Sequence, residues 1–228
     1  MSNTITEPIS RSNRQTSKTN EGNLPFMETT PAAVVLAAGR SRRLGRPKAL
    51  VGVNGRPLVA WIHQRLLAAG CEVMVVVNPD IADDVRAVLP GVLIAVNDNP
   101  DAGRTRSLQL GLLALSEHLG RSPQRLVMAP VDRPGWTEEM LVPLLSSSQS
   151  AALAHNGRRG HPVVLDAPAI ERVLAARPDA SLRTLVDFSP VEVHAPWLHL
   201  NIDTEDDVSA LNENEAALAT CFPQGEGI

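Results

Sequence analysis

The sequence predicts an α/β fold in which a doubly wound, mostly parallel sheet carries helices on both faces. Two observations lead to this prediction. From Pro31 onward, short apolar runs alternate with stretches of helical periodicity, and this alternation implies right-handed crossovers between parallel strands. The first runs are also continuously apolar, which is typical of strands buried on both faces. In such sheets ligands bind beyond the carboxyl ends of the strands, so the loops there are examined first.

The expected elements follow this alternation. The apolar runs predict strands at 32–37, 72–77, 92–96 and 125–132, and helical periodicity predicts helices at 56–70, 80–89 and 105–119. Beyond residue 138 the order loosens, and the sequence predicts a small, mixed and partly antiparallel addition. That part is expected to hold helices at 138–145, 167–176 and 180–187, an apolar segment at 151–155, a turn over 156–165, a strand over 197–202 and a final helix.

The composition indicates a single domain between two tails. Residues 1–30 are polar and aperiodic, so they are expected to form a disordered tail, followed by a single domain over 31–212 and a C-terminal tail over 213–228. Met27 directly precedes the first ordered segment, and we regard it as an alternative translation start to Met1. The composition does not predict an oligomeric state.

Charge and residue usage exclude several classes of function. The net charge is −4, tyrosine is absent and only 3 phenylalanines occur, so the chain lacks the basic surface and stacking aromatics of nucleic-acid-binding proteins. Cys71 and Cys221 are far apart and form no CxxC motif, which favours a reduced chain. The sequence shows neither a long apolar span nor a secretory signal. We therefore expect a cytoplasmic protein without a nucleic-acid or membrane partner.

The stretch "LAAGRSRRLGRPKAL", Leu36–Leu50, follows the first strand. Gly39 is expected to allow a tight turn whose N–H groups face an anion, and Arg43 and Lys48 would supply the charge that a triphosphate requires. The Walker spacing is absent, because five residues separate Gly39 from Gly45 and arginine follows Gly45. The dinucleotide pattern GxGxxG is also absent. A solvated basic turn is the remaining alternative.

This stretch resembles the signature LAAGxSxR[LM]GxxKxL of the MobA-like nucleotidyltransferases. "NGRPLVAWIHQRLLAAG" and "NPDAGRTRSLQLGL" resemble two further segments of that family, so the resemblance covers roughly residues 31–210. It implies a three-layer, Rossmann-like fold of the nucleotide-diphospho-sugar transferase type. It also implies that Arg43 and Lys48 contact the phosphates. The nucleotide would be held by the following residues: Leu36, Ala37, Ala38, Gly39, Asn97, Gly103 and Ser107. For Ser107, a plain helix-start residue is the alternative.

Two further segments resemble acidic elements of the family. "APVDRP" resembles the DxP element, and "LNIDTEDDV" resembles [DN]xDTPED with glutamate in place of proline. The resemblance makes Asp132 and Asp203 catalytic ligands of Mg²⁺, a cation that prefers oxygen ligands. The strand over 197–202 would deliver Asp203 to the edge that carries Asp132. The alternative for Asp132 is a helix N-cap, but Thr137 is better placed to cap that helix, as Thr204 is for the last one.

Histidine and tryptophan give weaker indications. "NGRRGHPVVL" resembles a GHP segment on the acceptor side of the family, so His161 would orient the acceptor phosphate, with a structural turn as the alternative. The remaining histidines show no metal-binding spacing. Trp61 and Trp197 are expected in the core, and Trp136 either covers the pocket or packs beneath it.

The resemblance implies an enzyme of the nucleotidyltransferase class that transfers NMP from an NTP to a phosphorylated small molecule, with Mg²⁺ and release of pyrophosphate. "LAAG" favours CTP, because the guanylyl branch typically has LAGG, and molybdopterin is the favoured acceptor. Arg104 replaces a methionine common in the molybdopterin branch, so a sugar phosphate or another phosphorylated metabolite remains an alternative. Less favoured classes are a nicotinamide-dependent oxidoreductase and a non-catalytic nucleotide-binding domain.

Overall fold

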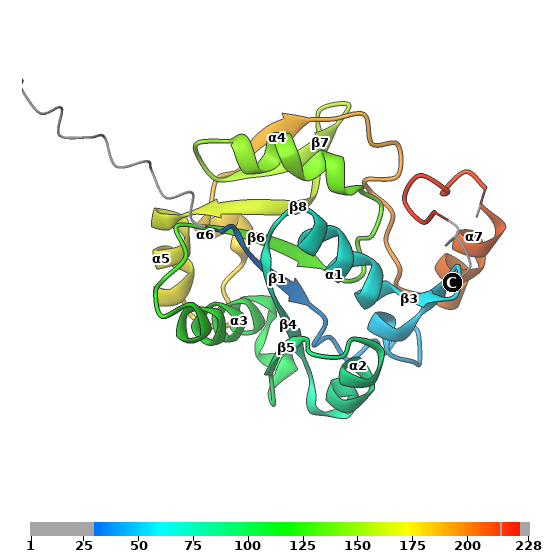
Figure 1. The fold of residues 1–228 in the computed structure, drawn as a ribbon, viewed down its shortest axis with the longest axis horizontal. Coiled ribbons are helices and arrows are strands. Elements are labelled where there is room, and N and C mark those ends of the chain that lie inside the picture. The colour runs from blue at the N-terminus through cyan, green and yellow to red at the C-terminus, as the bar shows by residue number, and fades with distance from the viewer. Residues whose placement is uncertain (1–29, 215, 224–228) are drawn as a thin grey trace, which may run out of the picture.

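The computed structural model describes residues 30–214 and 216–223, and one sheet organises them (Figure 1). Seven strands lie in the order β5-β4-β1-β6-β8-β7-β9. The strands are β1 (Ala32–Leu36), β4 (Glu72–Val77), β5 (Leu93–Val96), β6 (Arg125–Pro130), β7 (Ala151–His155), β8 (Arg158–Asp166) and β9 (Ser189–Glu192). Neighbouring strands from β5 to β6 are parallel, whereas β8 runs antiparallel to β6 and β7.

Helices cover both faces of this sheet, which gives three layers (Figure 1). One face is covered by α1 (Leu58–Ala68), α2 (Ala82–Val88) and α4 (Leu141–Ser146), and the other by α3 (Arg104–Leu119) and α5 (Ala167–Ala175). Outside these layers lie α6 (Leu182–Leu185), α7 (Glu205–Glu213), the hairpin of β2 (Gly52–Val53) and β3 (Arg56–Pro57), and the 3-10 turns η1 (Lys48–Leu50), η2 (Pro79–Ile81), η3 (Pro100–Ala102) and η4 (Glu138–Met140). The predicted fold class is confirmed.

The apolar runs form strands whose side chains enter the hydrophobic core on both faces of the sheet. In β1, Ala33 and Val35 face α1, whereas Ala32 and Val34 face α3. Successive side chains of a strand point to opposite faces, so a strand covered on both sides has to be apolar throughout. Gly111 of α3 lies directly against Val34 and Val76, where even a Cβ would stand 2.7 Å from a valine methyl. This close approach holds α3 on the parallel strands.

The second half is mixed and partly antiparallel, as predicted. Strands β8, β7 and β9 continue the same sheet beyond β6. The strand expected over 197–202 is absent, because Trp197–Leu200 form a turn and Asn201–Asp203 have no regular structure. Leu198 of this segment is buried in the core. The apolar residues there fill a gap between elements instead of pairing with a strand.

Part of the segment expected as a C-terminal tail packs into the core. Leu218, Cys221 and Phe222 are buried, and the Phe222 ring meets the Trp61 ring edge to face at 5.6 Å. Cys221 therefore does not lie in a polar tail, as the sequence suggested, and burial raises the pKa of its thiol. The expectations for residues 1–29, including the start at Met27, lie outside the described residues.

No helix among the described residues is both long and apolar enough to cross a bilayer.

Candidate active site

The predicted nucleotide loop opens onto a small cavity at the carboxyl ends of β1 and β6. These ends are adjacent, because Leu36 of β1 pairs with Pro130 of β6. The cavity has a volume of about 190 Å³. Its wall contains eight of the residues singled out from the sequence: Leu36, Ala37, Ala38, Gly39, Lys48, Gly103, Ser107 and Asp132. Residues from four segments of the chain thus meet where an α/β sheet binds its ligands.

The turn in this loop is made differently from the expectation. Gly39 is not in the left-handed region, and a Cβ there would meet nothing within 4 Å. The left-handed residues are Ser41, with φ 50°, and Gly45, with φ 75°. The backbone N–H of Lys48 donates to Ser41 Oγ at 3.0 Å. Ser41, which the sequence analysis did not select, therefore closes the loop and sets the position of Lys48.

Lys48 lies between the two predicted acidic residues. Its Nζ donates to Asp203 Oδ1 and lies 3.6 Å from Asp132 Oδ2. All three side chains are largely buried, with side-chain exposures of 14% for Lys48, 20% for Asp132 and 12% for Asp203. The hydrogen bond from Lys48 lowers the pKa of Asp203, and Arg43 adds to the effect. Asp203 is therefore an anion at neutral pH, held in a partly desolvated cluster.

Asp203 reaches Asp132 by a loop contact and not by a strand. The backbone N–H of Ile202 donates to the carbonyl of Asp132 at 3.0 Å. Close packing fixes the same contact, because a Cβ on Gly135 would stand 1.8 Å from the Trp197 carbonyl oxygen. Only glycine permits this approach between the two segments. The absent strand therefore leaves the predicted meeting of the two carboxylates intact.

A capping box holds Asp203 from its other side. Thr204 caps α7, and its hydroxyl accepts from the N–H of Asp207 at 3.3 Å. Asp207 Oδ2 in turn accepts the N–H groups of Asp203 and Thr204, each at 2.8 Å. Of the two expected capping residues, Thr204 makes the cap, whereas Thr137 precedes η4 without a side-chain cap bond. The start of α7 thus fixes the backbone that carries Asp203.

The loop arginines have different partners. Arg43 pairs through Nη2 with Asp203 Oδ2. Two other arginines of the loop pair away from the acidic pair: Arg40 with Asp101 at 3.0 Å, and Arg46 with Glu205 at 2.7 Å. Arg43 is itself largely exposed. Its contact with Asp203 therefore provides little stability by itself but keeps its guanidinium at the acidic pair.

Asn97 is placed differently from the other predicted nucleotide residues. It is fully buried, its amide donates to Ser107 Oγ at 2.9 Å, and its oxygen accepts the N–H of Asn99 at 3.0 Å. Asn97 is not part of the cavity wall, whereas Ser107 is. Gly103, with φ 112°, precedes the first turn of α3. The N-terminus of α3 therefore faces the cavity, and Asn97 orients Ser107 from behind.

A second and larger cavity, of about 940 Å³, adjoins the first. Leu36, Arg104, Pro130 and Asp132 line both cavities. His161 of β8 lies in the larger one, and burial lowers its pKa to about 4, helped by Arg133. His161 is therefore neutral at pH 7. Asp132 stands at the boundary, where a group bound in one cavity can meet a group bound in the other.

A buried guanidinium supports the loop beyond Asp132. Arg65 of α1 donates to the Pro134 carbonyl at 2.8 Å and to the Cys221 carbonyl. Its charge lies over the rings of Trp136 at 5.3 Å and Phe222 at 5.1 Å. Burial lowers the pKa of Arg65 to about 10, so it remains charged at neutral pH. Two positions were predicted for Trp136, over the pocket or beneath it. Trp136 is fully buried, so it packs beneath the site and does not cover it.

The acidic pair has the chemistry expected of a magnesium site. Both carboxylates contact one ammonium group, so their oxygens converge on a space that a cation already occupies. The described residues contain no cluster of three His, Cys, Asp or Glu side chains arranged to hold a metal. Mg²⁺ commonly takes one or two carboxylates and fills its remaining positions with water and phosphate oxygens. Asp132 and Asp203 therefore fit Mg²⁺ together with a phosphate ligand.

The family description that matches this chain is the MobA-like NTP transferase domain, over residues 33–194. The chain belongs to the MobA-like NTP transferase family. It is accordingly an enzyme of the nucleotidyltransferase class. The matched residues include the loop, Lys48, Asp132 and His161, whereas Asp203 lies beyond them.

Curated relatives of this MobA-like chain carry different names. A nicotine blue oxidoreductase from Paenarthrobacter nicotinovorans is 32% identical over 76% of this chain and 87% of its own length. A molybdenum cofactor guanylyltransferase from Rhizobium meliloti is 28% identical over 61% of this chain and 64% of its own length. A solved structure, the homologue of Mycobacterium tuberculosis rv0371c from Mycobacterium sp. strain JC1, has a TM-score of 0.71 at 24% identity and covers 83% of this chain and 98% of its own. That structure supports the fold.

Several residues of the MobA-like site were missed from the sequence. Arg133, Arg158, Arg159 and His199 line the larger cavity. The adjacent arginines of "NGRRGH" carried a signal, since a charged pair beside a predicted site residue is unusual in a turn. His199 carried none, because it lies in the segment that was expected to be a strand. Its position follows from the turn at Trp197–Leu200.

Proposed function

We propose that this chain transfers a nucleoside monophosphate from an NTP, with CTP favoured, to a phosphorylated small molecule, with molybdopterin favoured, and releases pyrophosphate. The observation that carries this proposal is the position of Lys48 between Asp203 and Asp132, the second of which lines both cavities. A site that only bound a nucleotide would not need paired carboxylates at the entrance to a second cavity.

The two cavities would separate the two substrates. The NTP enters the smaller cavity, where the N–H groups after β1 and the N-terminus of α3 face its phosphates. The acceptor enters the larger cavity and directs its phosphate toward Asp132. A phosphate monoester has a second pKa near 6, so it is largely a dianion at neutral pH and requires no general base. The site then contributes positioning and charge neutralisation.

Asp132 and Asp203 would hold Mg²⁺, which supplies charge neutralisation at the phosphate oxygens when it is bound. Lys48 and Arg43 both contact Asp203. When a triphosphate binds, these two cations turn to its oxygens and stabilise the charge that develops on the leaving pyrophosphate. His161, neutral at pH 7, donates a hydrogen bond to the acceptor phosphate.

The choice of nucleotide rests on the loop. "LAAG" supports CTP, whereas the name of the guanylyltransferase relative supports GTP as the alternative. The test is the thermal midpoint of the protein with CTP, GTP, UTP, ATP or NADPH, each with and without Mg²⁺. Mg²⁺-dependent stabilisation by CTP supports the proposal. Equal stabilisation by all four NTPs, or none, contradicts the choice of CTP.

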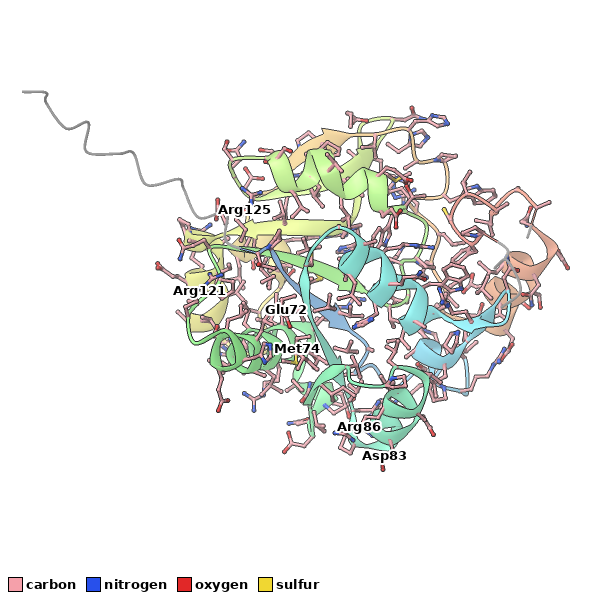
Figure 2. The ribbon with its side chains drawn as sticks, viewed as in Figure 1. Glu72, Met74, Asp83, Arg86, Arg121 and Arg125 are labelled. Atoms are coloured by element: carbon pink, nitrogen blue, oxygen red, sulfur yellow. The ribbon has the colours of Figure 1, made fainter. Side chains whose placement is uncertain are left out.

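The transfer itself is tested by pyrophosphate release. Molybdopterin is compared with a panel of sugar phosphates, since a sugar phosphate or another phosphorylated metabolite is the alternative acceptor. The matched controls are Lys48→Met, which removes the bridging cation, and Arg86→Gln, which changes an exposed arginine of α2 (Figure 2). The proposal requires that pyrophosphate release depends on the acceptor, is lost in Lys48→Met and is retained in Arg86→Gln.

A second candidate comes from the relative named nicotine blue oxidoreductase. This name favours a nicotinamide-dependent oxidoreductase, although the chain has no GxGxxG pattern after its first strand. The same thermal assay separates the two functions. Stabilisation by NADPH alone, without a need for Mg²⁺, would replace the transferase proposal. We place the reaction in the cytoplasm because both cysteines are free thiols.

A further inference from the structure

The larger cavity contains more positive charge than one phosphate requires. Five arginines line it: Arg104, Arg133, Arg158, Arg159 and Arg183. Among the described residues, only Arg159 of these five forms an ion pair, with Asp187 at 3.6 Å. Asp179, another acid of the wall, pairs with Arg177 outside it. A bound phosphate monoester carries about −1.5 to −2 charges, so its binding leaves about two of the four arginines without an ion pair still lacking a counter-charge.

The cations are spread along the cavity. Arg104 also lines the nucleotide cavity, and with Arg133 and Arg183 it helps to lower the pKa of His161, so these three residues lie at the reacting end. Arg133 also reaches the second histidine, because its Nη1 donates to the His199 carbonyl at 3.4 Å. Arg158 begins β8 and lies three residues before His161, a distance of about 10 Å along an extended strand. Of the cations near His199, Arg158 is therefore the one that lies away from the reacting end.

Both histidines present polar atoms that no described residue satisfies. His161 Nδ1 and His199 Nε2 are buried and lack a hydrogen-bond partner in the described part of the chain. A buried polar atom without a partner costs free energy, and such atoms commonly mark places where a ligand or water completes the bonding. Both histidines belong to the cavity lining, so each brings an unsatisfied ring nitrogen to its wall.

A large part of the cavity lining is apolar. It is formed by Leu108, Met128, Val163, Val186, Phe188 and Leu198. A wall of this kind binds a hydrocarbon or ring surface and offers little to a polyhydroxylated sugar. The cavity volume of about 940 Å³ is also near the upper end of the range for small-molecule sites. The lining thus matches a ligand with a large apolar body and more than one anionic group.

We propose that the acceptor carries a second anionic group, separated from its reacting phosphate by an apolar body, and that Arg158 with His199 binds this second group. This inference rests on the proposed function for the identity of the reacting end. It names the class of acceptor: a phosphorylated molecule with a distant phosphate, carboxylate or comparable anion. Simple sugar monophosphates lack that group and would leave the remote end unpaired.

The test uses two synthetic probes and the full chain. Hexylphosphonate has one anionic group, and 6-phosphonohexanoate has the same chain with a carboxylate at its far end. Calorimetric titration measures the Kd of each for the unaltered protein, Arg158→Gln, Arg158→Lys and Arg86→Gln. We expect the two-anion probe to bind about tenfold more tightly, as one added charge-assisted hydrogen bond provides. Arg158→Gln should remove this gain and leave the Kd of hexylphosphonate within about twofold.

The controls separate charge from fold. Arg158→Lys should restore part of the gain, and Arg86→Gln should change neither Kd, since Arg86 pairs with Asp83 on α2 (Figure 2). Arg158 is exposed, so its replacement should leave the thermal midpoint unchanged. The proposal is overturned if the carboxylate adds no affinity, or if Arg158→Gln weakens both probes equally.

The result is independent of transfer activity. An Arg158-dependent gain without any pyrophosphate release would contradict the proposed function and leave the two-anion site standing. Efficient transfer to acceptors with one anionic group, with no gain in affinity from the carboxylate, would contradict the two-anion site and leave the proposed function standing.

Discussion

The two sides of the shared wall carry their charges in opposite states. On the parallel side, Lys48 and Arg43 are already paired with Asp203. On the antiparallel side, Arg158 and Arg183 have no ion pair among the described residues, and two histidines are held neutral beside them. Under the proposed function, the paired charges exchange partners with a metal and a triphosphate, and the unpaired charges bind the anionic groups of the acceptor. The difference would then separate a side that carries out the transfer from a side that selects the acceptor.

We expect the largest effect from a substitution in the cluster of Lys48, Arg43 and Asp203. Asp203→Asn removes the anion that positions Lys48 and Arg43, so these two cations no longer stabilise the charge that develops in the transition state. We expect kcat for pyrophosphate release to fall by about 10³-fold, in the range seen for lost electrostatic stabilisation. Far-ultraviolet circular dichroism should stay unchanged. Asp206→Asn, in the exposed first turn of α7, is the matched control, and a similar loss there would show that the effect is not specific to the acidic pair.

The next effect concerns the support beneath both sides. Arg65→Met keeps the length of the side chain but leaves the carbonyls of Pro134 and Cys221 without their donor. We expect the free energy of unfolding to fall by about 2–4 kcal/mol, since two buried acceptors lose their hydrogen bonds. Urea denaturation measures this loss. The exposed Arg86→Met should change stability by less than about 0.5 kcal/mol, and equal effects of the two substitutions would contradict the assigned role of Arg65.

For the larger cavity, the test is the pH dependence of the free energy of unfolding, which reports the protonation of His161. The pKa of His161 is about 4 in the folded chain and about 6.5 in an unfolded one. Between these values the unfolded state binds more protons, so stability falls as the pH is lowered from about 7. We expect about 1–2 kcal/mol of stability to be lost between pH 7 and pH 5 through this group. His161→Gln should remove that part of the slope in urea titrations, and an unchanged slope would place His161 in a more solvated position.

We expect the smallest effect from the N-cap of α7, which holds the backbone of Asp203. Thr204→Ala removes the cap of α7 but not the carboxylate of Asp203. We expect about 1 kcal/mol of lost stability, the usual value for an N-cap. A fall in kcat should accompany it, because the backbone of Asp203 is held by the same capping box. Thr204→Ser, which retains the hydroxyl, should restore both quantities, and failure of that rescue would exclude capping as the cause.

The sequence predicts the parallel half well because its signal is local. Continuous apolar runs identify strands buried on both faces, and the loop after β1 carries its own motif. The strand expected over 197–202 was wrong because apolar content alone does not distinguish a strand from a turn that fills the core. Leu198 is buried by side-chain packing against Gly160 of β8, and the segment that carries it pairs with none of the described strands.

Residues far apart in the chain were harder to assign. Phe222 and Cys221 join the core through Arg65 and Trp61, more than 150 residues earlier in sequence, and no local pattern reports such a contact. His199 and Arg158 meet in one cavity for the same reason. Asn97 shows a different limit: the residue type suits a nucleotide, yet its amide is used within the protein to orient Ser107.

The hydrogen bond from Ile202 to Asp132 also has a consequence for how the enzyme is made. The acidic pair joins two points separated by about 70 residues, so its formation closes a long loop at an entropic cost. Leu198, Ile202 and Phe222 follow β9 in the chain and are buried in the core. Packing of this last part of the core and assembly of the acidic pair are therefore one event, and a chain that has not completed its core has not completed its site.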